Sequence, residues 1–169
     1  MNYFELFEIP VSLKVDAGKL AKKYFELQKK FHPDYYSKES PEVQADILEK
    51  VAQINKAFKT FKSPDETIKY VLMEKGLLEE EEKYQLPPGF LMEMMDLNEQ
   101  IAEALADGGE NLSLIKDGLA GTETEIYFPV REIVENYKES ITSTDELLKV
   151  KEYYYKKKYL NRLKAQVNL

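Results

Sequence analysis

The spacing of apolar residues limits this chain to a helical fold. Apolar side chains recur three and four positions apart over most of the sequence, and no useful run alternates between apolar and polar residues. Spacings of three and four place side chains on one face of an α-helix, whereas a half-buried strand requires alternation. The clearest stripe consists of Val43, Ile47, Val51, Ile54, Phe58 and Phe61. We therefore expect an all-α protein whose amphipathic helices bury these stripes against one another.

Start and stop signals divide the first half of the chain into four helices. Asp16 can cap one helix, Ser40 followed by Pro41 is a typical start of another, and Ser63 with Glu66 forms a capping box. The expected helices cover about residues 3–8, 17–31, 40–61 and 63–76, the last ending at Gly76. We expect the two long helices to pack as an antiparallel hairpin and to bury their stripes against the short first helix.

The composition of the middle of the chain predicts two domains. Residues 77–88 contain four consecutive glutamates and end in two prolines, which is typical of a linker. This linker is expected to join a first domain at residues 1–76 to a second at residues 89–169. The second domain is predicted to be a three-helix bundle.

The second domain is harder to divide into helices. The expected helices cover about residues 89–106, 123–141 and 144–167, the last introduced by a capping box at Ser143. Pro129 should kink the middle helix or mark its true start. Gly118 and Gly121 are expected to break any long helix over residues 110–122.

Composition excludes several kinds of site and partner. The chain has no cysteine and only one histidine, His32, so disulfides, thiolate metal sites and multi-histidine metal sites cannot form within it. The formal net charge of −7 argues against nucleic acid as a partner. The apolar runs are far shorter than the ~20 residues that span a bilayer, and the first residues do not read as a secretory signal. We expect a cytoplasmic protein with no membrane partner, no metal and no cofactor.

A tripeptide in the loop between the two long helices points to a specific kind of domain. The loop contains His32-Pro33-Asp34, a basic helix precedes it, and Ile54-Asn55-Lys56-Ala57-Phe58 lies on the helix that follows. With these features in this order, the first half resembles a J domain. The resemblance implies that the chain is not itself an enzyme but stimulates ATP hydrolysis by a DnaK-class chaperone.

The J-domain resemblance and the helical wheel together predict a chaperone-binding surface. Its expected residues are His32, Pro33, Asp34, Lys22, Lys23, Lys29 and Lys30. A cationic face of this kind steers an acidic partner and fixes its register. Two alternatives stay open: the lysines are merely a solvated helix face, and Pro33 and Asp34 merely stop the helix and form a turn.

The helix expected at residues 89–106 carries more apolar residues than one packing face needs. Five of them share one sector and are expected to face the core: Phe90, Met94, Leu97, Ile101 and Leu105. Leu91, Met92 and Met95 lie outside this sector, beside acidic residues. Exposed leucine and methionine next to charges are typical of a helical interaction face. The alternative is that they pack on the first domain.

A second resemblance concerns the partner of this face. Three segments are similar to the J proteins of iron–sulphur cluster assembly, the HscB/Jac-type co-chaperones. They are Phe90-Leu91-Met92-Glu93 ahead of an acidic helix, the opening Asn2-Tyr3-Phe4-Glu5-Leu6-Phe7, and the late segment Tyr159-Leu160-Asn161-Arg162-Leu163. The resemblance implies that the chain binds an IscU-type iron–sulphur scaffold protein and delivers it to an HscA-type chaperone. The scaffold-binding residues that it implies are Leu91, Met95, Asp96, Glu99, Glu103 and Tyr159. Met95 and Asp96 depart conservatively from the expected Leu-Glu, and residues 108–140 match poorly.

Two other functions are compatible with parts of the sequence. A J protein with a different client would keep the tripeptide but use the second domain as an unrelated adaptor. A small helical enzyme could use His32 as a general base, although one His beside one Asp falls short of a nucleophile, base and orienting group.

Overall fold

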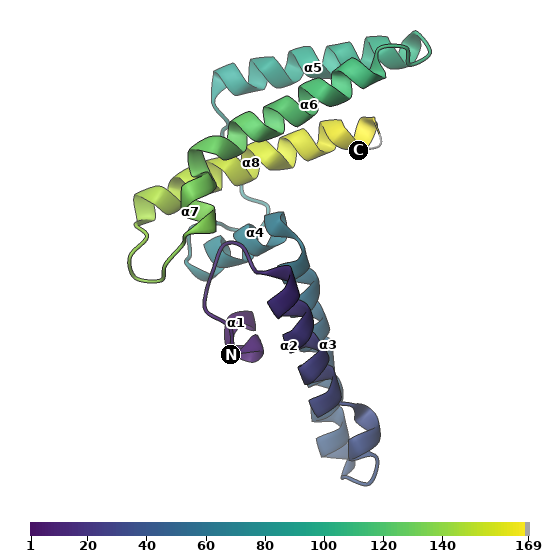
Figure 1. Cartoon of the computed structure of the whole chain (residues 1–169), viewed down its shortest axis with the longest axis vertical. Helices are drawn as coiled ribbons and strands as arrows, with labels where there is room; N and C mark the ends of the chain where they lie inside the picture. Colours follow the sequence, from purple (N-terminus) through teal and green to yellow (C-terminus); the bar gives the residue numbers. More distant parts are fainter. Residues whose placement is uncertain (168–169) are drawn as a thin grey trace. The chain divides into compact units, whose positions relative to one another are not determined.

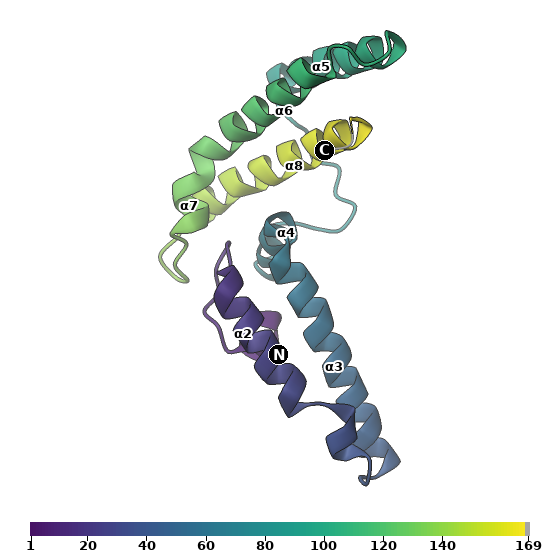
Figure 2. The same ribbon diagram turned by 45° about the vertical axis from the view of Figure 1, so that its right-hand side comes forward.

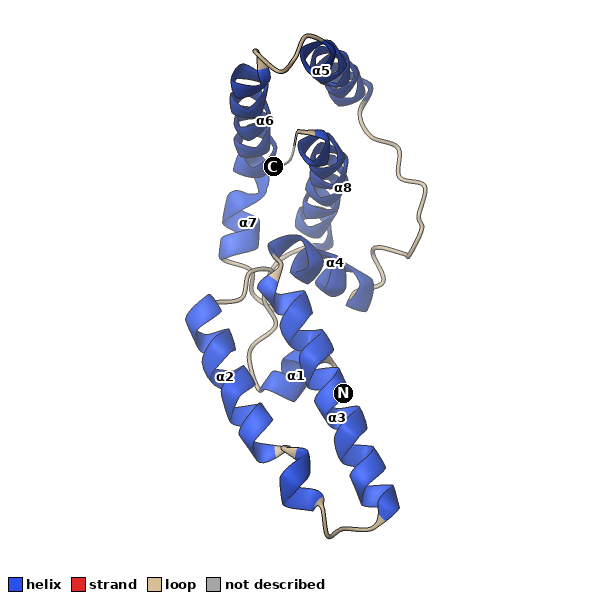
Figure 3. Cartoon of the chain, turned by 90° about the vertical axis from the view of Figure 1, so that its right-hand side faces the viewer, coloured by secondary structure: helices blue, strands red, loops and turns tan. Residues whose placement is uncertain are grey.

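The computed structural model describes residues 1–167, and these residues form helices joined by turns and loops, with no strand among them (Figures 1 and 3). The predicted all-α fold is confirmed. The chain divides into two compact units, one made of Met1–Val71 with Tyr137–Glu139 and the other of Leu72–Asn136 with the chain from Ser140 onward. No helix within residues 1–167 is long and apolar enough to cross a membrane.

The N-terminal unit is built on a helical hairpin. Helices α2 (Ala17–Lys30) and α3 (Pro41–Lys62) lie side by side and run in opposite directions (Figure 2). A 3₁₀ turn, η1 (Pro33–Tyr36), lies in the connection between them. The short α1 (Tyr3–Phe7) packs against both long helices, and α4 (Pro64–Glu74) follows α3. The predicted hairpin with short helices is confirmed.

The helices of this unit begin where the sequence predicts. The Asp16 carboxylate accepts a hydrogen bond from the Lys19 amide at 2.8 Å. The Ser63 hydroxyl accepts one from the Glu66 amide at 3.2 Å. Each side chain satisfies an amide that has no partner inside its helix, which is why the chain turns into a helix at these residues.

Aromatic side chains fill the core of the N-terminal unit. The Phe61 ring lies 4.7 Å from that of Phe4 and 5.6 Å from that of Phe7, measured between centroids. Tyr3 stacks on Tyr70 at 4.5 Å, and its amide donates to the Tyr70 hydroxyl at 2.9 Å. These contacts fix α1 against α3 and α4, and they lie at the opposite end of α3 from the loop that contains η1.

The C-terminal unit contains three long helices and a short one. Helices α5 (Pro88–Ala106), α6 (Leu112–Tyr127) and α8 (Thr144–Gln166) each pack against the other two, and α7 (Arg131–Glu135) packs on α8 (Figure 1). The three long helices bury one shared core, which includes Phe90, Met94, Ile101, Ala104, Ile115, Leu119, Leu160, Leu163 and Val167. The predicted bundle of three main helices is confirmed.

Two partly buried ion pairs join α6 to α8. Lys164 and Lys157 approach the Glu123 carboxylate at 2.7 Å and 3.2 Å. Burial on its own would raise the pKa of this carboxyl, but the hydrogen bonds from Lys164 and Lys157 outweigh burial and lower the pKa. Glu123 is therefore held in its charged form at the seam between the two helices.

The prediction that Gly118 and Gly121 break the helix is wrong. Helix α6 runs through both glycines from Leu112 to Tyr127. A glycine inside a helix costs about 1 kcal/mol relative to alanine, which is less than a buried leucine or isoleucine contributes. Ile115 and Leu119, four positions apart, are both buried in the core, and their burial offsets the cost.

The helix predicted over residues 123–141 is also wrong. Helix α6 ends at Tyr127, the 3₁₀ turn η2 (Phe128–Val130) contains Pro129, and α7 ends at Glu135. Proline cannot donate the hydrogen bond that would continue the ladder, so one long helix becomes two shorter ones. The loop after α7 leaves the Ile141 side chain 75% exposed, whereas the predicted helix placed it on an apolar stripe.

The predicted core face of α5 needs one correction. Phe90, Met94 and Ile101 are buried as expected, but Leu105 is 49% exposed and Ala104 is buried in its place. The inward face of an α-helix drifts because 3.6 residues per turn do not repeat evenly at spacings of three and four. About four turns after Phe90, this drift places Ala104 instead of Leu105 on the face that packs in the core.

Candidate functional site

The tripeptide lies in an exposed loop of the N-terminal unit. The His32 and Asp34 side chains are 52% and 87% exposed. The Asp34 amide donates to His32 Nδ1 at 3.3 Å, so the imidazole caps the 3₁₀ turn that Pro33 begins. The Tyr36 hydroxyl donates to the Lys30 carbonyl at 3.1 Å and ties this turn to the end of α2. The loop therefore has a defined backbone, while its imidazole and carboxylate remain accessible to a partner.

The arrangement around His32 does not form a catalytic set. Asp34 Oδ2 lies 3.6 Å from His32 Nδ1, and the nearby aromatic ring of Tyr35 lies 5.9 Å from the imidazole between centroids. No nucleophile with an orienting group completes the pair within the described chain. Residues 1–167 also contain no group of three or more histidine, cysteine or acidic side chains that could hold a metal ion. The loop is suited to docking.

The segment 54–58 of α3 positions α2, and with α2 the start of this loop. Ile54 and Ala57 are buried, and between them Asn55 Oδ1 accepts hydrogen bonds from the Tyr24 hydroxyl and the Gln28 amide group, both at 2.8 Å. The Tyr24 ring stacks on Phe58 at 3.8 Å. These contacts set the register of α2 against α3, which determines where the end of α2 and the loop lie.

The predicted lysines of α2 differ in their surroundings. Lys22, Lys29 and Lys30 are exposed, whereas Lys23 is half-buried and lies near two carboxylates, 4.0 Å from Glu8 and 3.8 Å from Glu26. The ammonium of Lys29 lies 5.4 Å from the centre of the Phe25 ring, which is itself exposed. Three of the four predicted lysines are therefore exposed, and Lys23 contributes less free charge to this face than the sequence predicts.

The predicted residues of α5 divide into a half-buried end and an exposed row. Leu91 is half-buried, while Met95 is 64% exposed and Asp96, Glu99 and Glu103 are all exposed. Their spacing of three and four places the acidic residues along one side of the helix. Met92, at 67% exposure, extends the apolar part of this surface.

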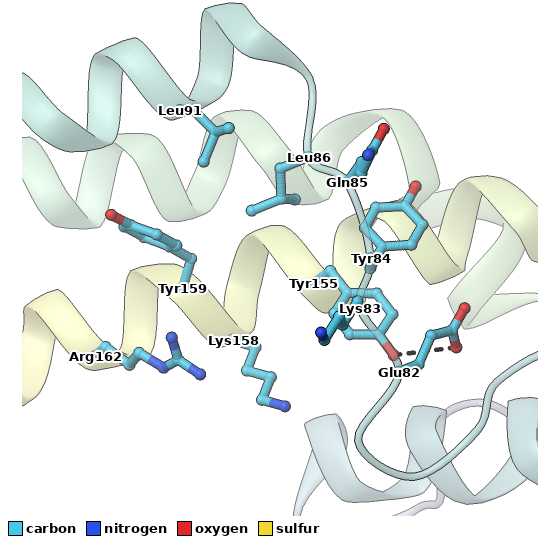
Figure 4. Close-up of a pocket in the computed structure, with 10 residues that line it drawn as sticks. All are labelled: Glu82, Lys83, Tyr84, Gln85, Leu86, Leu91, Tyr155, Lys158, Tyr159 and Arg162. Atoms are coloured by element: carbon cyan, nitrogen blue, oxygen red, sulfur yellow. Dashed lines mark hydrogen bonds between the residues drawn. The ribbon is translucent and has the colours of Figure 1, made fainter.

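Tyr159 of α8 joins Leu91 at one groove. The groove has a volume of about 660 Å³ and is lined by α5, α8 and the segment before α5 (Figure 4). Tyr159 is half-buried, and its ring meets that of Phe90 edge-on at 6.4 Å. Glu103, in contrast, lines a separate small pocket with Leu97 and Leu114. The structure thus brings Leu91 and Tyr159 together and leaves Glu103 apart from them.

Comparison with known proteins shows the family of the chain. The family model described as the HSCB C-terminal oligomerisation domain matches residues 86–168. The co-chaperone protein HscB homolog of Aliivibrio salmonicida is 36% identical over an alignment of 126 residues that covers 69% of this chain and 74% of that relative. The chain belongs to the HscB family of co-chaperones. The HscB homolog of Photobacterium profundum is 37% identical over 118 residues, which are 69% of this chain and 68% of the relative.

Solved HscB structures extend the match to the whole fold. The chaperone HscB from Vibrio cholerae superimposes with a TM-score of 0.78 at 28% identity, covering 99% of this chain and 96% of that one. The human co-chaperone HscB gives a TM-score of 0.82 at 26% identity, covering 99% of this chain and 81% of that one. The family resemblance read from the sequence is confirmed, and the fold is that of HscB, a J domain followed by a helical C-terminal domain.

Several groups at these surfaces of the HscB-family chain were not predicted from its sequence. Phe25 and Tyr35 expose aromatic rings beside the predicted chaperone-binding residues. Lys158 and Arg162 line the groove with Leu91 and Tyr159. Their spacing of four on α8 was a signal that they share one side of that helix, but nothing in the sequence showed that this side faces the groove.

Proposed function

We propose that this chain is a co-chaperone of iron–sulphur cluster assembly. It binds an IscU-type scaffold protein through the C-terminal domain, delivers it to an HscA-type chaperone of the DnaK class, and stimulates the ATPase of that chaperone. The observation that carries the proposal is the accessible His32-Pro33-Asp34 loop on the J domain of an HscB-family chain. Its client surface comprises Leu91, Met95, Asp96, Glu99, Glu103 and Tyr159.

The loop and the lysines act as one docking surface for the chaperone. His32 and Asp34 offer a ring nitrogen and a carboxylate at the end of α2, and Lys22, Lys29 and Lys30 add positive charge along the same helix. Positive charge steers an acidic partner, while hydrogen bonds to a carboxylate and an imidazole select its orientation. The chain supplies contacts that favour hydrolysis in the partner and does no chemistry itself.

The test is the steady-state rate of ATP hydrolysis by the purified HscA-type chaperone from the same organism. The chaperone is assayed with the scaffold alone, with the co-chaperone alone and with both together. Each assay that contains the co-chaperone is run with the wild type and with His32→Gln. We expect the scaffold and the wild-type co-chaperone together to stimulate the ATPase synergistically. His32→Gln should reduce this stimulation about 30-fold, because a binding hot spot contributes roughly 2 kcal/mol. Lys59→Gln, an exposed change on α3, is the control and should retain full stimulation.

Two other results contradict different parts of the proposal. Stimulation that the scaffold does not enhance keeps the chaperone interaction but removes the iron–sulphur client. Equal stimulation by wild type and His32→Gln removes the loop from the mechanism.

A further inference from the structure

The groove beside Leu91 has a prearranged wall. Lys151 Nζ donates to Glu82 Oε2 at 2.6 Å. The Tyr155 hydroxyl donates to Glu82 Oε1 at 3.2 Å (Figure 4). The Tyr84 ring stacks on the Tyr155 ring at 4.5 Å with an angle of 4° between their planes. The segment before α5 is thereby held against α8, so the groove exists before any partner arrives.

Among residues 1–167, Glu82 is the only acidic residue that lines the groove, and it is engaged within this wall. Glu82 accepts from both Lys151 and Tyr155, and the Lys151 hydrogen bond is the main reason why the pKa of Glu82 lies below its ordinary value. The carboxylate is therefore charged and paired with an ammonium. It adds little net negative charge to the groove.

The remaining charged residues of the groove are all cations. Lys83, Lys158 and Arg162 line it, and none of the three forms an ion pair with a described residue. Lys158 lies 5.9 Å from the centre of the Tyr155 ring. Beside these cations, Leu86, Leu91 and Tyr159 provide the apolar surface (Figure 4). Three cations around an apolar groove, none of them paired with a carboxylate of residues 1–167, contrast with the net charge of −7 of the chain.

The charged residues of α5 are all acidic, so the cations beside Leu91 come from α8 and from the segment before α5. Leu91 lies at the cationic groove, whereas Asp96, Glu99 and Glu103 form the acidic row toward the other end of the helix. At 1.5 Å per residue, Leu91 and Glu99 are about 12 Å apart along the axis. Met95 lies between them and is exposed.

We propose that the groove binds a segment of the scaffold protein in which an apolar side chain is flanked by carboxylates. The apolar side chain contacts Leu86, Leu91 and Tyr159, and the carboxylates pair with Lys158 and Arg162. The client surface is then bipolar, with a cationic groove at one end and the acidic row at the other, and it accepts a client in one direction only. The identity of the partner rests on the proposed function, whereas the chemistry of the groove rests on its residues.

A pair of peptides tests the chemistry of the groove without any scaffold. The full-length ¹⁵N-labelled protein is titrated with acetyl-Glu-Glu-Phe-Leu-Glu-Glu-amide and with its counterpart in which lysine replaces every glutamate. We expect the acidic peptide to shift the amide signals of Tyr84, Leu86, Leu91 and Lys158 and to bind about tenfold more tightly there than the basic peptide. Equal shifts by both peptides at these amides, or no shift there by the acidic one, overturn the proposal.

Charge reversal tests the same groove with the scaffold itself. Lys158→Glu/Arg162→Glu is compared with Lys116→Glu/Lys149→Glu, which makes the same charge change at two lysines of the C-terminal unit outside the groove. Calorimetric titration should show about tenfold weaker scaffold binding for the groove variant and little change for the control. Lys158→Gln/Arg162→Gln provides a milder second variant, and melting curves verify that each variant is folded.

The two experiments separate the two claims. Unchanged scaffold binding by the folded groove variants overturns the bipolar surface and leaves the proposed function intact. Failure of the wild type to bind scaffold, together with selective binding of the acidic peptide, overturns the proposed client and supports the groove chemistry.

Discussion

The loop at His32 and the groove beside Leu91 are both accessible, but they are assembled from very different lengths of chain. The hydrogen bonds made by the residues of the loop itself join positions at most seven apart, as in the bond from the Gln44 side chain to the Ser37 carbonyl. The wall of the groove joins Glu82 to Tyr155, which are 73 residues apart. A surface built locally can be read as a motif, whereas a surface assembled from distant segments depends on the whole unit being folded.

This difference predicts that the two surfaces depend on different parts of the core. Leu160 is completely buried among Met94, Ile101 and Leu119 in the C-terminal unit, and it adjoins Tyr159 of the groove. Leu160→Ala should lower the free energy of unfolding by about 2–5 kcal/mol, because it removes packed methyl groups and leaves a cavity. Urea unfolding followed by circular dichroism measures this loss.

Ile54→Ala is the matched change in the N-terminal unit, since Ile54 is also completely buried. We expect Leu160→Ala to impair scaffold binding first and Ile54→Ala to impair chaperone stimulation first. If either change removes both functions equally while the protein remains folded, the two surfaces do not depend on separate cores.

A change in the groove itself sharpens the comparison. Leu91→Ala removes apolar surface from the groove and should weaken scaffold binding about tenfold, since truncating a contact residue at an interface costs roughly 1–2 kcal/mol. Calorimetric titration with the scaffold measures the change. Leu148→Ala, at an exposed leucine of α8 that does not line the groove, is the control and should bind normally. His32→Gln should also bind the scaffold normally, and a loss there would mean that the two surfaces are coupled.

The wall of the groove predicts a specific dependence on pH. The pKa of Glu82 is lowered from 4.5, chiefly by the hydrogen bond from Lys151. Its contribution to stability is therefore present above pH 4.5 and is lost as the pH falls through the lower, folded-state pKa. The pKa of Tyr155 is raised to about 12, chiefly by burial and next by the charge of Glu82. The contribution of Tyr155 to stability is therefore lost as the pH rises from 10 toward 12.

Glu82→Gln should remove most of the acid-dependent part and lower the free energy of unfolding by about 1 kcal/mol at neutral pH. Melting temperatures measured from pH 3 to pH 7 provide the test. Glu110→Gln, at an exposed carboxylate of the same unit, should leave the profile unchanged. Identical acid profiles for Glu82→Gln and the wild type would mean that this wall does not hold the groove together.

The same contrast explains how much could be predicted from the sequence. The capping residues Asp16 and Ser63 and the loop at His32 depend on residues near one another in the chain, and the hairpin joins two consecutive helices. These features were predicted correctly. The pairing of Glu82 with Lys151 was not predicted, because a run of four glutamates gives no indication of which one turns toward a lysine 69 residues later. The placement of Lys158 and Arg162 at the same groove as Leu91 was missed for the same reason.

Helix α6 shows the second limit of prediction from local pattern. Glycine propensity predicted a break, but Ile115 and Leu119 meet a core formed by α5 and α8, and that burial outweighs the local preference. Pro129 was recognised as a disruption, yet sequence alone left open whether it bends a helix or separates two. The loss of a backbone donor is local, but the path of the chain after it is decided by packing.

The smallest predicted effect tests this account of α6 directly. Gly121 is exposed within the helix, and an added Cβ there would meet no atom within 4 Å. Gly121→Ala should therefore raise the free energy of unfolding by about 0.5–1 kcal/mol, because alanine loses less backbone entropy on folding and no contact is disturbed. Gly108→Ala is the matched control, since Gly108 has equal space but a φ of +89°, where a side chain is strained. It should destabilise the protein by about 1–2 kcal/mol. Urea unfolding distinguishes the opposite signs, and destabilisation by Gly121→Ala would mean that α6 is not a continuous helix at that residue.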